Sequence, residues 1–321
     1  MNFRIILLLL CLLSFNAFSY KNNSNEGDKL ETSVSIDQST DGEVSALCEI
    51  KAIKPKDGIV RVLAIGNSFS DDAIEHYLNG LASAAGKKII IGNLPVGGAS
   101  LALHLENATT NAEAYTYGKI NVDGLKISKA NTSIATALKD EPWDYISFQQ
   151  VSFNAGKYET YVESLPQLFS FVKSIVKNPE TKYLLHQTWA YAGNSTHGGF
   201  ANYSNNQDTM YHAIVEAVNK ASQLIDIYKI VPSGTAIQNG RATVVGDYFT
   251  RDGYHLDFII GRYTASAAWF EILFGESVVG NPYKPEALTD FEAKLAQYAA
   301  HFACLKPNEV NAMLDFQKKI Q

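Results

Sequence analysis

Short apolar runs alternate with segments of helical periodicity along most of this chain, and this alternation limits the fold more than any other feature. The first run, residues 60–65, is a candidate buried strand, and a helical pattern over residues 71–85 follows it at once. Strand, helix and strand in repeated order predict a parallel sheet covered on both faces. We therefore expect an α/β fold, a three-layer α/β/α sandwich around a central, mainly parallel sheet.

Further strands and helices are expected at regular intervals. The strands are residues 88–92, 145–148, 183–185 and 230–231, and the helices are residues 131–139, 158–176, 207–225, 258–273 and 285–303. The last two helices are predicted to be amphipathic.

Two segments interrupt the alternation. Residues 114–129 predict a β-hairpin with its turn at residues 121–124, and residues 190–206, rich in Gly, Asn, Ser and Thr, predict a loop.

The first nineteen residues predict a cleavable signal peptide. Arg4 gives a positive start, residues 5–13 form an apolar run, and residues 17–19 fit a small-x-small cleavage site. The run is too short to span a bilayer comfortably. Cys11 suggests a lipoprotein as the alternative, but no small residue precedes it. We expect a secreted or periplasmic protein whose mature form has no membrane span.

The rest of the chain is expected to form one globular domain with flanking segments. The predicted divisions are a signal peptide at 1–19, a flexible polar leader at 20–58, the α/β domain at 59–305 and a C-terminal tail at 306–321. After cleavage two cysteines remain, Cys48 and Cys304. In an oxidising compartment they could form a disulfide, and two unpaired thiols are the alternative.

Charge and motif content exclude several classes of function. The formal net charge is −6, from 27 Lys and Arg against 33 Asp and Glu, and the chain has no basic run. This argues against nucleic-acid binding, which needs clustered cations to neutralise phosphates. The sequence has no H-E-x-x-H motif and no cluster of His and Cys. We therefore expect no metal and no cofactor.

A serine directly follows the first predicted strand. Residues 66–70 read Gly-Asn-Ser-Phe-Ser, so Ser68 stands where a strand gives way to a helix. Free N–H groups at a helix N-terminus favour negative charge that develops on a substrate oxygen. Ser68 is therefore a candidate nucleophile, and Ser70 is expected only to cap the helix. A purely structural turn is the alternative, because such turns commonly carry Ser, Asn and Gly.

Candidate partners for this serine lie near the end of the domain, in Asp252-Gly253-Tyr254-His255. A carboxylate three residues before a histidine in a turn can bind Nδ1 and leave Nε2 free to take a proton. An ordinary turn with a half-exposed histidine is the alternative. Acid and base share one turn here, and Ser70 stands where G-x-S-x-G has its last glycine, which points away from the α/β-hydrolase fold.

The two motifs together resemble those of the SGNH or GDSL hydrolases, which have G-D-S after the first strand and D-x-x-H near the C-terminus. Gly66-Asn67-Ser68 and residues 252–255 occupy these places here, within a resemblance that spans residues 59–273. The stretches IGNSFSDDAIEHYL, VGGASL, WDYISFQQVS and RDGYHLDFIIGRYTASAAWFE resemble a branch of uncharacterised Bacteroidetes proteins with a GNSFS first motif. The resemblance implies an SGNH, flavodoxin-like fold and a catalytic triad of Ser68, His255 and Asp252.

The resemblance also implies an oxyanion hole built from the serine N–H, a glycine N–H and an asparagine side chain. Ser68 and Gly98 match the first two places. The place of the asparagine, within a G-x-N-D motif, reads Phe148-Gln149-Gln150 in this chain. We expect Gln150 to supply the amide, with Gln149 as the alternative because strand alternation points the two side chains to opposite faces.

Residues after the predicted third and fourth strands are candidates for substrate contacts. Aromatic faces beside polar amides suit sugar rings, although core packing is an alternative explanation for such residues. The candidates are Gln149, His186, Gln187, Trp189 and Tyr191.

These observations predict a serine esterase that hydrolyses O-acyl, chiefly O-acetyl, esters on a glycan or another small ester substrate through an acyl-enzyme. The alternative is a non-catalytic carbohydrate-binding or scaffold protein on the same fold, suggested by Asn67 in place of Asp and by the missing G-x-N-D motif. The distance between Ser68 Oγ and His255 Nε2 distinguishes the two, because catalysis requires hydrogen-bond reach.

Overall fold

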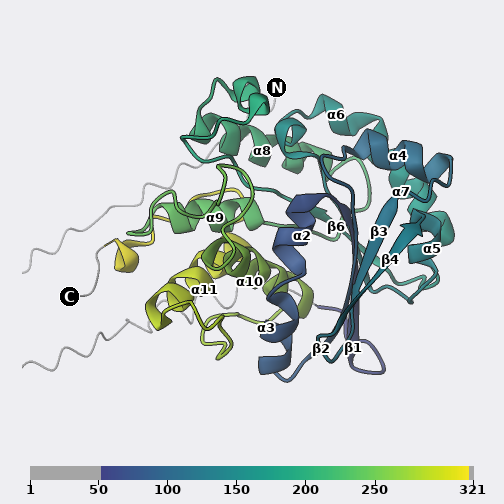
Figure 1. Cartoon of the computed structure of the whole chain (residues 1–321), viewed down its shortest axis with the longest axis horizontal. Helices are drawn as coiled ribbons and strands as arrows, with labels where there is room; N and C mark the ends of the chain where they lie inside the picture. The colour runs from purple at the N-terminus through teal and green to yellow at the C-terminus, as the bar shows by residue number, and fades with distance from the viewer. Residues whose placement is uncertain (1–51, 318–321) are drawn as a thin grey trace, which may run out of the picture. The chain divides into compact units, whose positions relative to one another are not determined.

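One seven-stranded sheet organises residues 52–317, the part of the chain that the computed structural model describes (Figure 1). The strands are β1 (Ile59–Gly66), β2 (Lys88–Pro95), β3 (Tyr115–Ile120), β4 (Lys126–Thr132), β5 (Tyr145–Phe148), β6 (Lys182–His186) and β7 (Lys229–Val231). Their spatial order is β4-β3-β2-β1-β5-β6-β7. The order β2-β1-β5-β6-β7 is parallel throughout, and the β3–β4 hairpin adds antiparallel pairs at one edge. The predicted mainly parallel α/β sheet is therefore confirmed.

The central strand β1 is buried because helices cover both faces of the sheet. Its apolar run carries Val62, Leu63 and Ile65, all at 0% exposure. The parallel strands follow the flavodoxin-like order, in which the chain reverses direction across the sheet between β1 and β5. Ligands bind such sheets at the carboxyl ends of the strands beside this reversal.

The helices form two groups on opposite sides of the sheet (Figure 1). One group contains α2 (Ser68–Ile74), α3 (Leu78–Ala84), α9 (Ser233–Arg241), α10 (Ile260–Phe274) and α11 (Asp290–Leu305). The other contains α4 (Leu101–Thr109), α5 (Ile134–Leu138), α6 (Glu159–Val162) and α7 (Ser164–Ile175). Helix α8 (Gln207–Ala221) contacts α9 and the 3-10 helix Gly198–Tyr203. The layered α/β/α arrangement agrees with the prediction.

Polar side chains fix where several of these helices begin. Asn67, Ser100, Ser133, Asn206 and Thr289 are the N-caps of α2, α4, α5, α8 and α11, and each side chain accepts a backbone N–H from the first turn. Ser, Thr and Asn are favoured there because their oxygens satisfy N–H groups that have no intrahelical acceptor. The cap of α2 is Asn67, so the prediction that Ser70 caps this helix is wrong.

The helix predicted over residues 71–85 is two helices. Helix α2 starts earlier, at Ser68, and α3 resumes at Leu78 after a break. Tertiary bonds hold the break: Asn93 Nδ2 donates to Glu75 Oε1 at 2.9 Å, and Tyr77 Oη donates to the carbonyl of Phe258 at 2.8 Å. Such contacts override local helical periodicity.

Other helical predictions also need correction. The periodicity of residues 158–176 is divided between α6 and α7, and α4 and α9 were not expected at all. Helix α10 is buried on nearly every residue, so it is a core helix rather than an amphipathic one. Only α11 of the last two predicted helices keeps an exposed face.

The segments that flank the predicted domain pack against it. Ile53 N–H donates to Tyr145 Oη at 2.9 Å, and Val244 N–H donates to the carbonyl of Phe316 at 3.0 Å. Cys304 is buried on α11. Within residues 52–317, no helix has the length and apolar character needed to cross a membrane. The predicted signal peptide, most of the leader and Cys48 lie outside the described residues.

Candidate active site

Ser68 is the first residue of α2 and directly follows the turn at the end of β1. Asn67 closes this turn: its Oδ1 accepts the N–H of Phe69 at 3.0 Å. As the first residue of a helix, Ser68 has a backbone N–H without an intrahelical acceptor. Its side chain is half-buried. The nucleophile candidate therefore stands at the carboxyl edge of the sheet with a free donor beside it.

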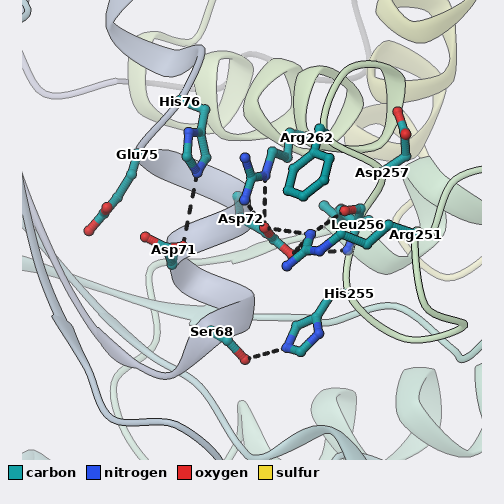
Figure 2. Close-up of polar contacts among 12 residues, drawn as sticks. Ser68, Asp71, Asp72, Glu75, His76, Arg251, His255, Leu256, Asp257 and Arg262 are labelled. Carbon is teal, nitrogen blue, oxygen red and sulfur yellow. Dashed lines mark hydrogen bonds and ion pairs between the residues drawn. The ribbon is translucent and has the colours of Figure 1, made fainter.

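His255 and Asp252 complete a hydrogen-bonded chain with Ser68. His255 Nε2 lies 2.9 Å from Ser68 Oγ, a pair that Figure 2 shows directly. His255 Nδ1 lies 2.6 Å from Asp252 Oδ2. With the carboxylate ionised, Nδ1 carries the imidazole proton and Nε2 can accept one from the serine. The candidate nucleophile, base and orienting acid are thus brought together from two ends of the domain.

The carboxylate of Asp252 is held in place by its own turn. Its Oδ1 accepts the N–H groups of His255 at 2.7 Å and of Tyr254 at 3.1 Å. Partial burial raises the pKa of Asp252, but the hydrogen bonds from the His255 ring and from these two N–H groups outweigh it, and the pKa lies below its ordinary value. Asp252 therefore stays ionised and keeps the imidazole in one orientation.

The predicted glycine donor lies on a turn that is bonded to the nucleophile turn. Gly98 is exposed and has φ of +68°, a conformation that glycine adopts readily. The carbonyl of Gly66 accepts the N–H of Val96 at 3.2 Å, and Asn67 Nδ2 donates to the carbonyl of Ala99 at 3.1 Å. Residues on both sides of Gly98 are therefore joined to the segment that carries Ser68.

The prediction that Gln150 supplies an oxyanion donor is wrong. The side chain is 2% exposed, and its Nε2 donates to the carbonyl and to the Oγ1 of Thr160 at 3.1 and 3.0 Å. Its Oε1 accepts the N–H groups of Leu101 and Val151. Both amide protons are already used, so Gln150 joins the start of α4 to the end of β5 rather than facing a substrate.

Gln149 and His186 are also structural. Gln149 Nε2 donates to Asn67 Oδ1 at 2.6 Å, and its Oε1 lies 3.1 Å from His186 Nδ1, whose Nε2 lies 3.0 Å from Ser233 Oγ. Burial lowers the pKa of His186 to about 3, so the ring is neutral at physiological pH. The network supports the turn that carries Ser68, and neither side chain is exposed enough to contact a substrate.

Three further residues that were predicted to contact substrate are core residues instead, which agrees with the alternative explanation of core packing. Gln187, Trp189 and Tyr191 are each 0% exposed. Trp189 stacks on Phe69 with ring centroids 4.3 Å apart, and its Nε1 donates to the carbonyl of Tyr254 at 2.7 Å. Trp189 thus links the residue after the nucleophile to the turn that carries the base.

Two rings beside His255 were not predicted. Tyr254 lies with its ring centroid 4.2 Å from that of His255, and His197 from the 190–206 loop lies 4.8 Å from Tyr254. Both are only half-buried. Burial, followed by the positive charge of His255 when protonated, lowers the pKa of His197. The Gly- and Ser-rich composition of the loop indicated its position but not which of its side chains returns to the site.

One group of acidic and imidazole side chains has spacing suited to a cation. The ligand atoms of Asp71, Asp72 and His76 lie within 4.8 Å of one another. However, Arg251 and Arg262 already contact Asp72, and two guanidinium groups oppose a bound cation. This group therefore does not fit a metal centre.

The comparisons with known proteins place the chain in a family. Residues 61–303 match the family model DUF4886, described as a domain of unknown function. A DUF4886 family protein from Bacteroides uniformis is 50% identical, with 80% of this chain and 99% of that chain covered and a TM-score of 0.79. No curated protein matches the chain.

Two more distant structures are similar at lower scores. A candidate SGNH hydrolase from Slackia heliotrinireducens is 19% identical, with 67% of this chain and 99% of that chain covered and a TM-score of 0.44. The acetylxylan esterase Axe2 from Geobacillus stearothermophilus is 14% identical, with 71% and 98% covered and a TM-score of 0.45. At these values no activity can be transferred from either protein.

Proposed function

We propose that this chain, which belongs to the DUF4886 family, is a serine esterase that hydrolyses O-acyl esters. The observation that carries the proposal is the hydrogen-bonded order Asp252, His255, Ser68, with separations of 2.6 and 2.9 Å. A serine hydroxyl alone is a weak nucleophile, and an adjacent, oriented imidazole is what activates it. A binding protein has no need of this alignment.

In the proposed reaction Ser68 Oγ attacks the ester carbonyl while His255 Nε2 takes the hydroxyl proton. The N–H groups of Ser68 and Gly98 hold the resulting oxyanion. His255 then gives its proton to the departing alcohol, which leaves an acyl group on Ser68. Water attacks this acyl-enzyme, His255 takes the proton of the water, and the acid is released as the serine regains its hydrogen. Asp252 stabilises the imidazolium throughout.

We propose a short acyl group, chiefly acetyl, on a glycan alcohol. The chain neighbours of Ser68, Asn67 and Phe69, and the Trp189 ring that stacks on Phe69 are 0–2% exposed, so they offer no open surface to a long acyl chain. On the solvent side the half-buried rings of Tyr254 and His197 offer apolar faces with polar edges, which suit a sugar ring. Hydrolysis of p-nitrophenyl esters should therefore fall steeply from acetate to octanoate.

Labelling with a fluorophosphonate probe tests the mechanism directly. Peptide mapping should find the probe on Ser68, and Ser68→Ala should abolish labelling and lower p-nitrophenyl acetate hydrolysis by about 10³-fold or more. Ser70→Ala is the matched control from the same motif and should still label on Ser68. A folded parent that takes up no probe would refute the esterase and favour a non-catalytic carbohydrate-binding protein.

Two further assignments stay proposals. We propose that the chain falls in the GNSFS branch of the SGNH hydrolases, supported by residues 66–70. We also propose export to the periplasm or medium, supported by the charged start and apolar run of residues 1–19. N-terminal sequencing of the protein isolated from its producing cells tests the second.

A further inference from the structure

Asp72 is a fully buried carboxylate one helical turn beyond the nucleophile. Its side chain is 0% exposed. Residues four apart on a helix lie on the same face, about 5–6 Å apart between Cβ atoms, so Ser68 and Asp72 of α2 face the same neighbour. That neighbour is the segment that carries Asp252 and His255. A place in the first turns of a helix does not by itself explain why this carboxylate is buried.

Within residues 52–317, the hydrogen bonds and ion pairs of the Asp72 carboxylate come from that segment and from the helix that follows it. Arg251 Nη1 lies 3.0 Å from both carboxylate oxygens, and the N–H of Leu256 donates to Oδ2 at 2.9 Å. Arg262 on α10 donates through Nε at 2.8 Å and approaches through Nη2 at 2.7 Å. Figure 2 shows Asp72 between the two guanidinium groups, with Ser68 and His255 one turn away.

The bonded residues stand immediately before and after the acid–base pair. Arg251 precedes Asp252, and Leu256 follows His255. The N–H of Arg251 donates to the carbonyl of His255 at 3.0 Å, and its guanidinium also donates to the carbonyl of Leu256. Asp72 therefore holds both ends of a closed turn that carries Asp252 and His255.

The ring of Phe258 also contacts both guanidinium groups. Its ring centre lies 4.7 Å from the guanidinium carbon of Arg251 and 4.7 Å from that of Arg262. A planar guanidinium that stacks on a ring and also bonds a carboxylate has little freedom to rotate. The turn is thus attached to α2 through a carboxylate that is 0% exposed and through guanidinium groups that stack on a ring.

We propose that Asp72, with Arg251 and Arg262, forms a positioning site that sets the distance between Ser68 and His255. The inference rests on the proposed esterase function, since the distance matters only if the pair transfers a proton. Asp72 and the two arginines touch no reacting atom in this scheme. They act through the placement of the base relative to the nucleophile.

Asp72→Asn tests the proposal, with Asp71→Asn as the matched control. Both variants remove one negative charge from the same turn of α2, but Asp71 lies 3.9 Å from His76 and makes no bond to residues 251–256 among the described contacts. In the purified full chain we expect Asp72→Asn to lower kcat for p-nitrophenyl acetate and the rate of fluorophosphonate labelling by about 100-fold, with KM within about twofold. Asp71→Asn should stay within about twofold in both.

Arg251→Lys is the second variant, because Asp72→Asn leaves two guanidinium groups without their carboxylate and can prevent folding. Lysine keeps the charge but cannot bond Asp72 and the carbonyl of Leu256 together. We expect kcat about tenfold lower at unchanged KM, measured on protein whose fold is verified by circular dichroism.

The outcomes separate the two proposals. If the parent neither labels on Ser68 nor hydrolyses the ester, the esterase function fails and this inference fails with it. If the parent is active and a folded Arg251→Lys or Asp72→Asn variant keeps the kcat of Asp71→Asn, only the positioning role is overturned. A variant that loses thermal stability but keeps kcat also overturns the positioning role, because a purely structural bond changes the folded fraction and not the turnover of folded enzyme.

Discussion

Asn67→Asp tests how the nucleophile turn is built, because it introduces the residue type of the G-D-S motif at a place where the structure needs an amide. Asn67 is 2% exposed, and its Oδ1 accepts from Phe69 N–H and from Gln149 Nε2. Its Nδ2 donates to the carbonyl of Ala99 at 3.1 Å. An aspartate keeps both acceptor bonds but places an oxygen against the Ala99 carbonyl.

The cost of this change can be worked from the lost bond. Removing one buried hydrogen bond costs about 1 kcal/mol, and leaving the Ala99 carbonyl unpaired beside a second oxygen adds about 1–3 kcal/mol. We therefore expect the free energy of unfolding to fall by about 2–4 kcal/mol, and Tm by roughly 5–10 °C for a domain of this size.

The effect on activity follows from the position of Ala99 next to Gly98. Loss of an oxyanion donor typically costs about 10²–10³-fold in kcat, and a displaced donor costs less. We expect Asn67→Asp to lower kcat for p-nitrophenyl acetate by about 10–100-fold at nearly constant KM, because the bond to the oxyanion strengthens only in the transition state.

The matched control is Asn239→Asp, made in α9. Asn239 is 0% exposed, its Nδ2 donates to the carbonyl of Ala299 at 3.0 Å, and its Oδ1 accepts the N–H of Asn311 at 2.6 Å. It should lose a similar amount of stability and keep kcat within about twofold, since it makes the same type of bond outside the site. If Asn67→Asp keeps parental kcat while it loses stability as the control does, the bond to Ala99 does not position Gly98.

Two further predictions concern buried groups. Burial lowers the pKa of His104 to about 4 and of His186 to about 3, so the unfolded chain binds these protons first. Above pH about 6.5 both rings are neutral in the folded and in the unfolded chain. As pH falls from there towards these values, the free energy of unfolding decreases by about 1.4 kcal/mol per pH unit for each group. Measured by urea unfolding, the free energy of unfolding of His186→Gln should change with pH less steeply than that of the parent, by that amount, between about pH 5.5 and 4.5. A pH dependence equal to that of the parent would contradict the assignment. Trp189→Phe removes the donor to the Tyr254 carbonyl and should cost about 1–3 kcal/mol of stability and slow fluorophosphonate labelling, whereas Trp143→Phe, which loses an equivalent indole bond, should cost stability alone.

The sheet could be predicted from the sequence because its signals are local. The apolar run of β1 and the exposed, Gly-containing turn of the β3–β4 hairpin carry their pattern within a few residues. Helix boundaries were predicted less well, since bonds such as Tyr77 Oη to Phe258 join residues that are 181 positions apart. No periodicity within residues 71–85 contains that information.

The candidate triad was predictable for the same reason, and the surrounding site was not. Ser68 follows a strand directly, and Asp252 and His255 share one turn, so each signal is short. Gln150 and Trp189 also follow strands, but whether such a residue faces solvent depends on which other segment covers it. Gln150 and Trp189 are both buried in the interior of the domain, and the sequence contains no local sign of that burial.

The arrangement of α2 explains why the site depends on such distant contacts. The helix has seven residues, too few to be stable by its own hydrogen bonds, so its orientation is decided by the groups that bond to it. Asn67 bonds one end to the turn that carries Gly98, and Asp72 bonds the next turn to the segment that carries His255. Ser68 lies between these two attachments. If the proposed esterase is correct, the distances from Ser68 to Gly98 and to His255 depend on two side chains outside the candidate triad, and we expect a change at either to lower turnover while Ser68, His255 and Asp252 are all still present.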